Sequence, residues 1–459
     1  AHDQASSSCG RFFGSDCRLS AKSDLTPMPA LTWEQFGRWL ERLYVVAMLV
    51  GLTQGPVLQL WWTGARAEGL PVKTAIVATY LVLQLPTVFI FAYQRFTPRL
   101  LRGPIGALVA FVTWLIITTA WATLSSHTIV EVLSLATTCV AGLYLAVRFS
   151  VVDKMILTCA AMQICVVWSY VAIQRDWPES TGPFGEWIGI YYNRNSLAPV
   201  ASVGALSALV LLWITIRNKV WPAGIGIALL LVDIVVFNVF VLLKTESETT
   251  LYAGAIAIGA WLLISGWLAL HRHGTSTKIL TTTWMTVTSV VLSLPWVLVF
   301  GIKSMGGFLR HFGIGGREGL WVLSHDGFLE KPWLGWGWMS AWETPNFLPR
   351  ELWTWQSEIA GPWSHSSFYD ILLGGGLVAV ALFVFMLLWT MAHHASQLPL
   401  MHVGQTYTAL GLFVLFSSTQ ESFIVGNHFL MVIFIAGLFG PVFDSAVRSG
   451  VIAGPRTAG

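Results

Sequence analysis

Residues 222–242, PAGIGIALLLVDIVVFNVFVL, decide the fold class of this chain. Only Asp233 is charged in this stretch, and a helix needs about 20 mostly apolar residues to cross the hydrocarbon core of a bilayer. Similar runs recur along the sequence, which therefore predicts an all-α integral membrane protein with about 12 transmembrane helices. The predicted spans are 43–63, 73–92, 104–124, 128–147, 153–173, 194–216, 222–242, 249–269, 280–301, 367–391, 403–419 and 424–446.

The composition of the whole chain agrees with this interpretation. Of 459 residues, 55% are hydrophobic and 11% are charged, and the mean hydropathy is +0.66. Soluble domains carry roughly 25% charged residues, so cytosolic enzymes, disordered chains and nucleic-acid binders are excluded. Three of the five Cys (139, 159 and 165) fall in apolar runs, where Cys behaves as a small hydrophobic residue, and we expect no disulfide framework.

The distribution of Lys and Arg orients the spans, because these residues are enriched in cytoplasmic segments. With both termini in the cytoplasm, the inner segments hold 16 of the 26 Lys and Arg, and the net charge is +9 inside and −4 outside. We therefore expect a multi-pass protein of the cytoplasmic (inner) membrane. The predicted parts are a cytoplasmic segment 1–42, helices within 43–301, an extracytoplasmic loop 302–366, helices within 367–446 and a cytoplasmic tail 447–459.

The large loop between predicted helices 9 and 10, residues 302–366, is unusually rich in tryptophan. It holds eight of the 24 Trp, at positions 321, 333, 336, 338, 342, 353, 355 and 363. An interfacial aromatic belt accounts for some of them, but a belt spreads over both faces of all the helices. Flat aromatic rings also stack on sugars, so Trp321, Trp336 and Trp363 are candidate substrate-binding residues.

Three residues near predicted outer helix ends form the candidate chemical site. Arg194 lies where an outer loop enters the sixth span, Arg317 lies in the large loop, and His365 precedes the tenth span. Each alone is explained as a membrane anchor or a solvated charge. Together they favour an anionic ligand, because Arg binds diphosphate through charge-assisted hydrogen bonds and His can accept a proton from a hydroxyl. There is no Asp-x-Asp motif, and we expect no metal and no cofactor.

Several short motifs in residues 190–446 resemble the O-antigen ligase family, which includes O-antigen and exopolysaccharide polymerases. The first five spans match that family only in number and hydrophobicity. Ser366 stands where the family usually has Asn. The motifs are 192–196 (YNRNS), 244–250 (KTESETT), 316–321 (GREGLW) with 331–337 (KPWLGWG), 364–368 (SHSSF) with 374–377 (GGGL), and 419–421 (TQE).

The resemblance implies a metal-independent, inverting glycosyltransferase on the outer face of the membrane. Its donor would be a glycan on polyprenyl (undecaprenyl) diphosphate, and its acceptor a hydroxyl of a glycan or of a lipid-linked molecule. Arg194 and Arg317 would hold the diphosphate, and His365 would orient or deprotonate the acceptor. Further substrate-binding candidates are Asn195, Arg310, Lys244 and His325. We expect contact with membrane lipids, no nucleic acid, and a monomer or weak oligomer.

Three alternatives remain open from the sequence. Within the family, a ligase and a polymerase differ in the acceptor, which loop geometry decides. A glycosyltransferase that uses a polyprenyl-phosphate sugar would show acidic residues in the first outer loop, where only Glu68 occurs. A transporter of lipid-linked oligosaccharides would show charged residues deep within several spans.

Overall fold

The structure is a computed structural model that describes residues 32–65, 71–93, 101, 103–217, 223–270, 317–344, 364–397, 404–424 and 426–448. Within these ranges 80% of the residues are α-helical and none lies in a strand, which confirms the all-α prediction. The ninth predicted span, Arg310 and Trp363 lie outside the described residues. The chain divides into two units, Ala1–Leu43 and Tyr44–Gly459, and the second contains every described candidate residue.

The described helices follow the predicted apolar runs closely. Five of them, α5, α6, α7, α8 and α13, include segments that are long and apolar enough to cross a membrane. The helices are α1 (Trp33–Leu52), α2 (Gly55–Ala65), α3 (Pro71–Tyr93), α4 (Pro104–Ile117), α5 (Ser125–Arg148), α6 (Val151–Gln174), α7 (Arg194–Arg217), α8 (Ala223–Lys244), α9 (Glu248–Leu270), α11 (Glu318–Glu330), α13 (Ser367–Gln397), α14 (Gly404–Ser417) and α15 (Phe429–Arg448).

The first predicted run, 43–63, is not one helix. Helix α1 ends at Leu52 and α2 begins at Gly55, with Gln54 between them at φ 76°. Pro56 explains the break, because a proline ring clashes with the carbonyl four residues earlier, here that of Leu52, and removes a hydrogen-bond donor. Helix α1 starts at Trp33, within the predicted segment 1–42, so the end of that segment is helical.

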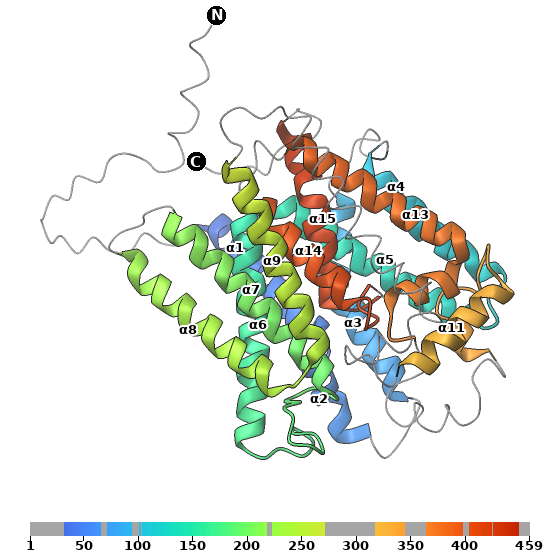
Figure 1. The fold of residues 1–459 in the computed structure, drawn as a ribbon, viewed down its shortest axis with the longest axis horizontal. Helices are drawn as coiled ribbons and strands as arrows, with labels where there is room; N and C mark the ends of the chain where they lie inside the picture. The colour runs from blue at the N-terminus through green and yellow to red at the C-terminus, as the bar shows by residue number, and fades with distance from the viewer. Residues whose placement is uncertain are drawn as a thin grey trace, which may run out of the picture. The chain divides into compact units, whose positions relative to one another are not determined.

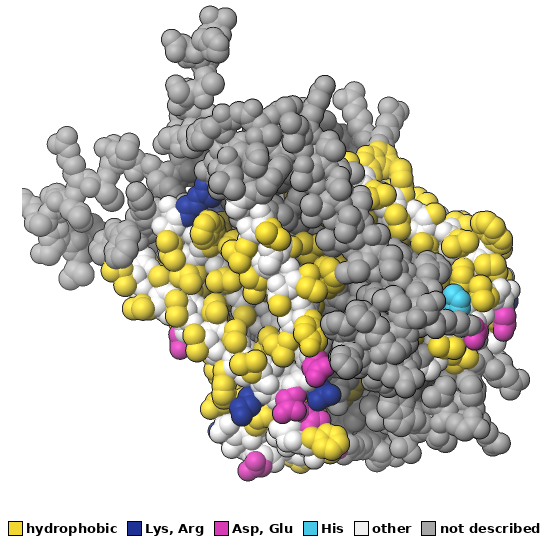
Figure 2. Space-filling view, in the orientation of Figure 1, with side chains coloured by type: hydrophobic (Ala, Val, Ile, Leu, Met, Phe, Trp, Pro, Cys, Tyr) yellow, Lys and Arg dark blue, Asp and Glu magenta, His cyan; other side chains and the backbone are white. Residues whose placement is uncertain are grey.

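Helix α14 connects two groups of helices (Figure 1). On one side α6 and α8 pack on α7, and α9 packs on α7 and on α14. On the other side α15 packs on α5, α13 and α14, while α4 packs on α13. Figure 2 shows a broad area of hydrophobic side chains on the described part of one face, with most of the charged side chains toward its lower edge. This distribution suits contact with lipid.

The glycine run of residues 374–376 breaks α13, and the loop segment 331–337 fills the break. Gly376 has φ 64°, and a side chain there would collide with the carbonyl of Trp333. The backbone carbonyls of Leu373 and Gly374 accept hydrogen bonds from the N–H groups of Trp336 (2.7 Å) and Gly337 (3.1 Å). Two motifs that lie far apart in the sequence therefore meet and fix the large loop to the start of α13.

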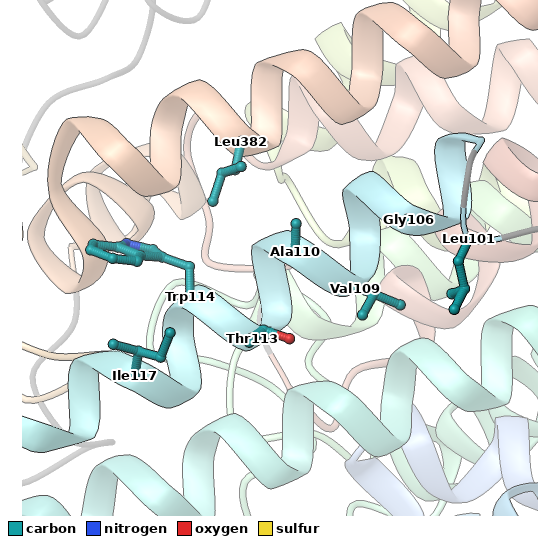
Figure 3. Close-up of a pocket in the computed structure, with 8 residues that line it drawn as sticks. All are labelled: Leu101, Gly106, Val109, Ala110, Thr113, Trp114, Ile117 and Leu382. Carbon is teal, nitrogen blue, oxygen red and sulfur yellow. The ribbon is translucent and has the colours of Figure 1, made fainter. Parts of the chain in front are cut away.

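An apolar groove of about 390 Å³ lies along α4. Figure 3 shows Trp114 and Ile117 toward one end of the groove, Leu101 at the other, and Leu382 of α13 above it. Thr113 is its only lining residue with a hydroxyl group. None of the candidate site residues lines this groove, so it is a feature separate from the polar site.

Candidate functional site

The centre of the site is the side chain of Glu421, in the connection between α14 and α15. Its carboxylate accepts hydrogen bonds from Asn195 Nδ2 at 2.9 Å and from Arg317 Nη2, and its other oxygen lies 2.9 Å from His365 Nδ1. The Glu421 side chain is only 11% exposed. Three of the predicted site residues, from three separate segments, therefore converge on one acid.

The partners of Glu421 keep its carboxyl group ionised. Burial by itself would raise the pKa of this carboxyl, but the charge of Arg317 and the hydrogen bonds from His365 and Asn195 lower it below the ordinary value of 4.5. An ionised carboxylate only accepts hydrogen bonds, so His365 Nδ1 is the N–H donor in this pair. The imidazole nitrogen suited to accepting a proton is then Nε2.

Each partner of Glu421 is fixed by its own helix end. Asn195 lies in the first turn of α7. Its side-chain Oδ1 accepts a hydrogen bond (3.0 Å) from Oγ of Ser247, the residue just before α9. Arg317 directly precedes α11 and also donates to the backbone carbonyl of Gln420. His365 lies two residues before α13, with φ 51° and a side chain 27% exposed. The helix order therefore gathers residues that lie more than 200 positions apart.

Arg194, next to Asn195 at the start of α7, is half-buried. It forms no ion pair with any residue that the structure describes. Because Glu421 balances the charge of Arg317, the charge of Arg194 remains uncompensated among these immediate neighbours. A half-buried arginine in this position is suited to an anionic ligand.

Two other candidates lie on helices around this centre. Lys244 ends α8 and is exposed, with the exposed acids Glu246 and Glu248 close in sequence. His325 is half-buried on α11, with its ring near Phe328. The side chain of Glu421 is bound by Asn195, Arg317 and His365 rather than by Lys244 or His325, whose binding roles stay predictions.

The described tryptophans of the large loop differ in exposure. Trp321 is 4% exposed, and its indole N–H donates to the carbonyl of Ser364 at 3.0 Å, next to His365. Trp336 is half-buried, with Lys331 Nζ 3.9 Å from the centre of its ring. Trp321 is therefore buried and holds the residue before His365 through a hydrogen bond, whereas Trp336 keeps part of its surface accessible.

Two acids of the site were not singled out from the sequence as site residues. Glu421 is part of the TQE motif, and Asp370 lies inside the tenth predicted span, five residues after His365. Asp370 is 2% exposed and accepts hydrogen bonds from Ser364 and Ser422. An acid within an apolar run was the available signal, because such residues are costly in a membrane and tend to be functional.

These features define an all-α, multi-pass membrane protein with a buried Arg–Glu–His cluster between helix ends. No group of three or more His, Cys, Asp or Glu in the described part of the chain is arranged to hold a metal ion. No protein-family model matches the chain, and no curated protein matches it significantly.

Proposed function

We propose that the protein is a metal-independent, inverting glycosyltransferase of the O-antigen ligase or polysaccharide polymerase type. It transfers a glycan from polyprenyl (undecaprenyl) diphosphate to an acceptor hydroxyl on the outer face of the cytoplasmic membrane. The observation that carries the proposal is the ionised Glu421, which binds both His365 and Arg317, with Arg194 next in sequence to Asn195, the third partner of Glu421.

The proposed reaction is a single displacement at the anomeric carbon of the donor. The acceptor oxygen forms a bond to this carbon while the bond from the carbon to the diphosphate oxygen breaks. The electron pair of that bond leaves with the polyprenyl diphosphate, and the acceptor proton passes to His365 Nε2. One displacement inverts the anomeric configuration.

The residues of the site divide this work between them. Arg194 and Arg317 stabilise the charge that develops on the leaving diphosphate, a role suited to guanidinium groups because they donate several parallel hydrogen bonds. Arg317 uses two of its nitrogens on Gln420 and Glu421, and its five N–H groups leave donors for phosphate. Glu421 orients His365 and stabilises the imidazolium ion that forms.

A reconstituted assay tests the proposal. The purified protein in lipid nanodiscs is given a polyprenyl-diphosphate oligosaccharide and a panel of glycan and lipid-linked acceptors, and mass spectrometry identifies which acceptor grows. We expect a product of inverted configuration, formed equally well in the presence of EDTA. The growing acceptor also distinguishes a ligase from a polymerase.

Matched variants assign the activity to the site. We expect Arg317→Ala and His365→Ala to lower transfer by about 10²-fold or more, while Arg175→Ala and His127→Ala, which replace residues of the same types outside the Glu421 cluster, retain it. Full activity of both site variants would overturn the catalytic assignment. Movement of the intact lipid-linked donor across the bilayer without transfer would indicate a transporter instead.

A further inference from the structure

Asp370 lies in the first turn of α13, five residues after His365. One carboxylate oxygen accepts hydrogen bonds from the hydroxyl of Ser364 at 2.6 Å and from its backbone N–H at 3.3 Å. The other oxygen accepts a hydrogen bond from the hydroxyl of Ser422. One carboxylate therefore fixes both the residue before His365 and the residue after Glu421.

His365 needs such support because its backbone adopts a costly conformation. Its φ of 51° lies in the left-handed region, which is unfavourable for a residue with a side chain. The two flanking residues are held firmly, since Ser366 N–H donates to Ser364 Oγ (3.1 Å) and Trp321 donates to the Ser364 carbonyl. The left-handed turn aims the imidazole at Glu421.

Ser367, the first residue of α13, also joins the His365 segment to the connection between α14 and α15. Ser367 N–H donates to the Ser418 carbonyl at 3.0 Å, and Ser367 Oγ accepts the N–H of Ile424 at 2.8 Å. Ser367 and Asp370 therefore attach the start of α13 to both sides of Glu421. In an ordinary capping box an acid at the third helical position bonds to the residue just before the helix, whereas Asp370, at the fourth position, binds Ser364 and Ser422.

We propose that Asp370 is a positioning residue, which sets the distance and orientation between His365 and Glu421 by binding Ser364 and Ser422. Its importance for catalysis rests on the proposed function. Asp370 touches neither substrate nor reacting atoms; it acts through His365. Displacing a catalytic group by about 1 Å costs as much as 10²-fold in rate, so this indirect role has a large expected effect.

The geometric part is tested without any substrate. Solid-state NMR of protein labelled with ¹⁵N-histidine in lipid reports the hydrogen bonding of each imidazole, and His365→Ala identifies the His365 signals. We expect Asp370→Asn to shift the His365 ring nitrogens because the contact with Glu421 changes. Ser422→Ala, which removes one contact, should cause a smaller shift, and Ser422→Thr, which keeps the hydroxyl, should leave the signals in place.

The control is Asn238→Ala, which removes another buried hydrogen bond, the one to Gln163 between α8 and α6. Unchanged His365 signals in both Asp370→Asn and Ser422→Ala overturn the proposal. An equal shift in Asn238→Ala also overturns it, since the effect would then follow from general destabilisation.

Activity gives the second measurement. We expect Asp370→Asn to lower transfer by about 10- to 100-fold in otherwise unaltered protein. In the His365→Ala background it should have no additional effect on residual transfer, whereas a purely structural role would lower activity in both backgrounds and overturn the proposal. If the NMR shifts appear but no donor supports transfer by the unaltered protein, the proposed function fails while the positioning by Asp370 stands.

Discussion

The connection between α14 and α15 contains two buried polar clusters that differ in charge. Near its start, Glu421 binds Arg317, His365 and Asn195, and all three partners come from helix ends. Near its end, Asn427 binds two neutral residues within helices: its side-chain Oδ1 accepts a hydrogen bond from Gln84 Nε2 of α3 (3.3 Å), and its backbone N–H donates to Thr138 Oγ1 of α5 (2.9 Å).

The comparison separates a structural cluster from a chemical one. The residues around Asn427 are neutral and 7% exposed or less, so they anchor the connection at little electrostatic cost. The cluster at Glu421 contains charged groups and an imidazole whose side chain is 27% exposed, and burying such charges is costly. Proteins are expected to retain such a costly cluster of buried charges where the charges act on a ligand.

The largest expected effect is on the activity of the charged cluster. We expect His365→Ala to lower glycan transfer by about 10²–10⁴-fold, the usual contribution of a general base, with little change in the unfolding temperature. Initial rates with a lipid-linked donor and thermal unfolding of the same sample check both expectations. A rate within twofold of the unaltered protein would remove His365 from the mechanism.

Glu421→Gln is expected to affect both stability and activity. The amide keeps the shape of the side chain but leaves the charge of Arg317 uncompensated, which costs about 3–5 kcal/mol when a buried pair is broken. Transfer should fall by about 10²-fold because His365 loses its orienting carboxylate. Chemical denaturation and initial rates measure the two effects, and an unchanged rate would assign Glu421 a structural role alone.

The neutral cluster should show the opposite pattern. Gln84→Met keeps the volume of the side chain but removes the hydrogen-bond donor to Asn427 Oδ1. We therefore expect a loss of about 1–3 kcal/mol in the free energy of unfolding. Transfer by the folded protein should remain within about twofold of the unaltered rate. If the rate instead falls as far as in Glu421→Gln, the division between a structural and a chemical cluster is wrong.

The smallest expected effect is the dependence of stability on pH. The pKa of Glu421 is lowered in the folded protein relative to its ordinary value of 4.5, so the unfolded state binds the proton more tightly. The stabilisation from Glu421 is therefore complete above about pH 4.5 and is lost as the pH falls through the lowered pKa. Unfolding temperatures between pH 7 and 3 should show a smaller acid-induced loss in Glu421→Gln than in the unaltered protein.

Several elements were predictable because their signals are local. A run such as 222–242 specifies a helix by its length and hydrophobicity, and the described helix α8 covers it almost entirely. The break before α2 was not predicted, although Pro56 marked it, because membrane helices often tolerate proline. The number of spans and their sidedness stay predictions, as do the roles of Arg310 and Trp363.

The residues that donate hydrogen bonds to Glu421 were predictable as site candidates, and the acids of the site were not. Arg317, His365 and Asn195 were candidates because of their types and their places near helix ends, and the fold brings all three to Glu421. Sequence patterns do not reveal pairs between residues 56 to 226 positions apart, so the Glu421 contacts were not foreseeable.

The sequence by itself determined that this protein is helical and multi-pass, because hydrophobicity and helix length act locally along the chain. It also supplied the arginines and the histidine suited to a diphosphate and a hydroxyl. Only the tertiary structure decided that Arg317 and His365 share one acid, that Trp321 binds the residue before His365 and that Asp370 attaches the His365 segment to that of Glu421. The physical reason is that charge compensation and hydrogen-bond geometry depend on distances between helix ends, which the packing of the helices sets.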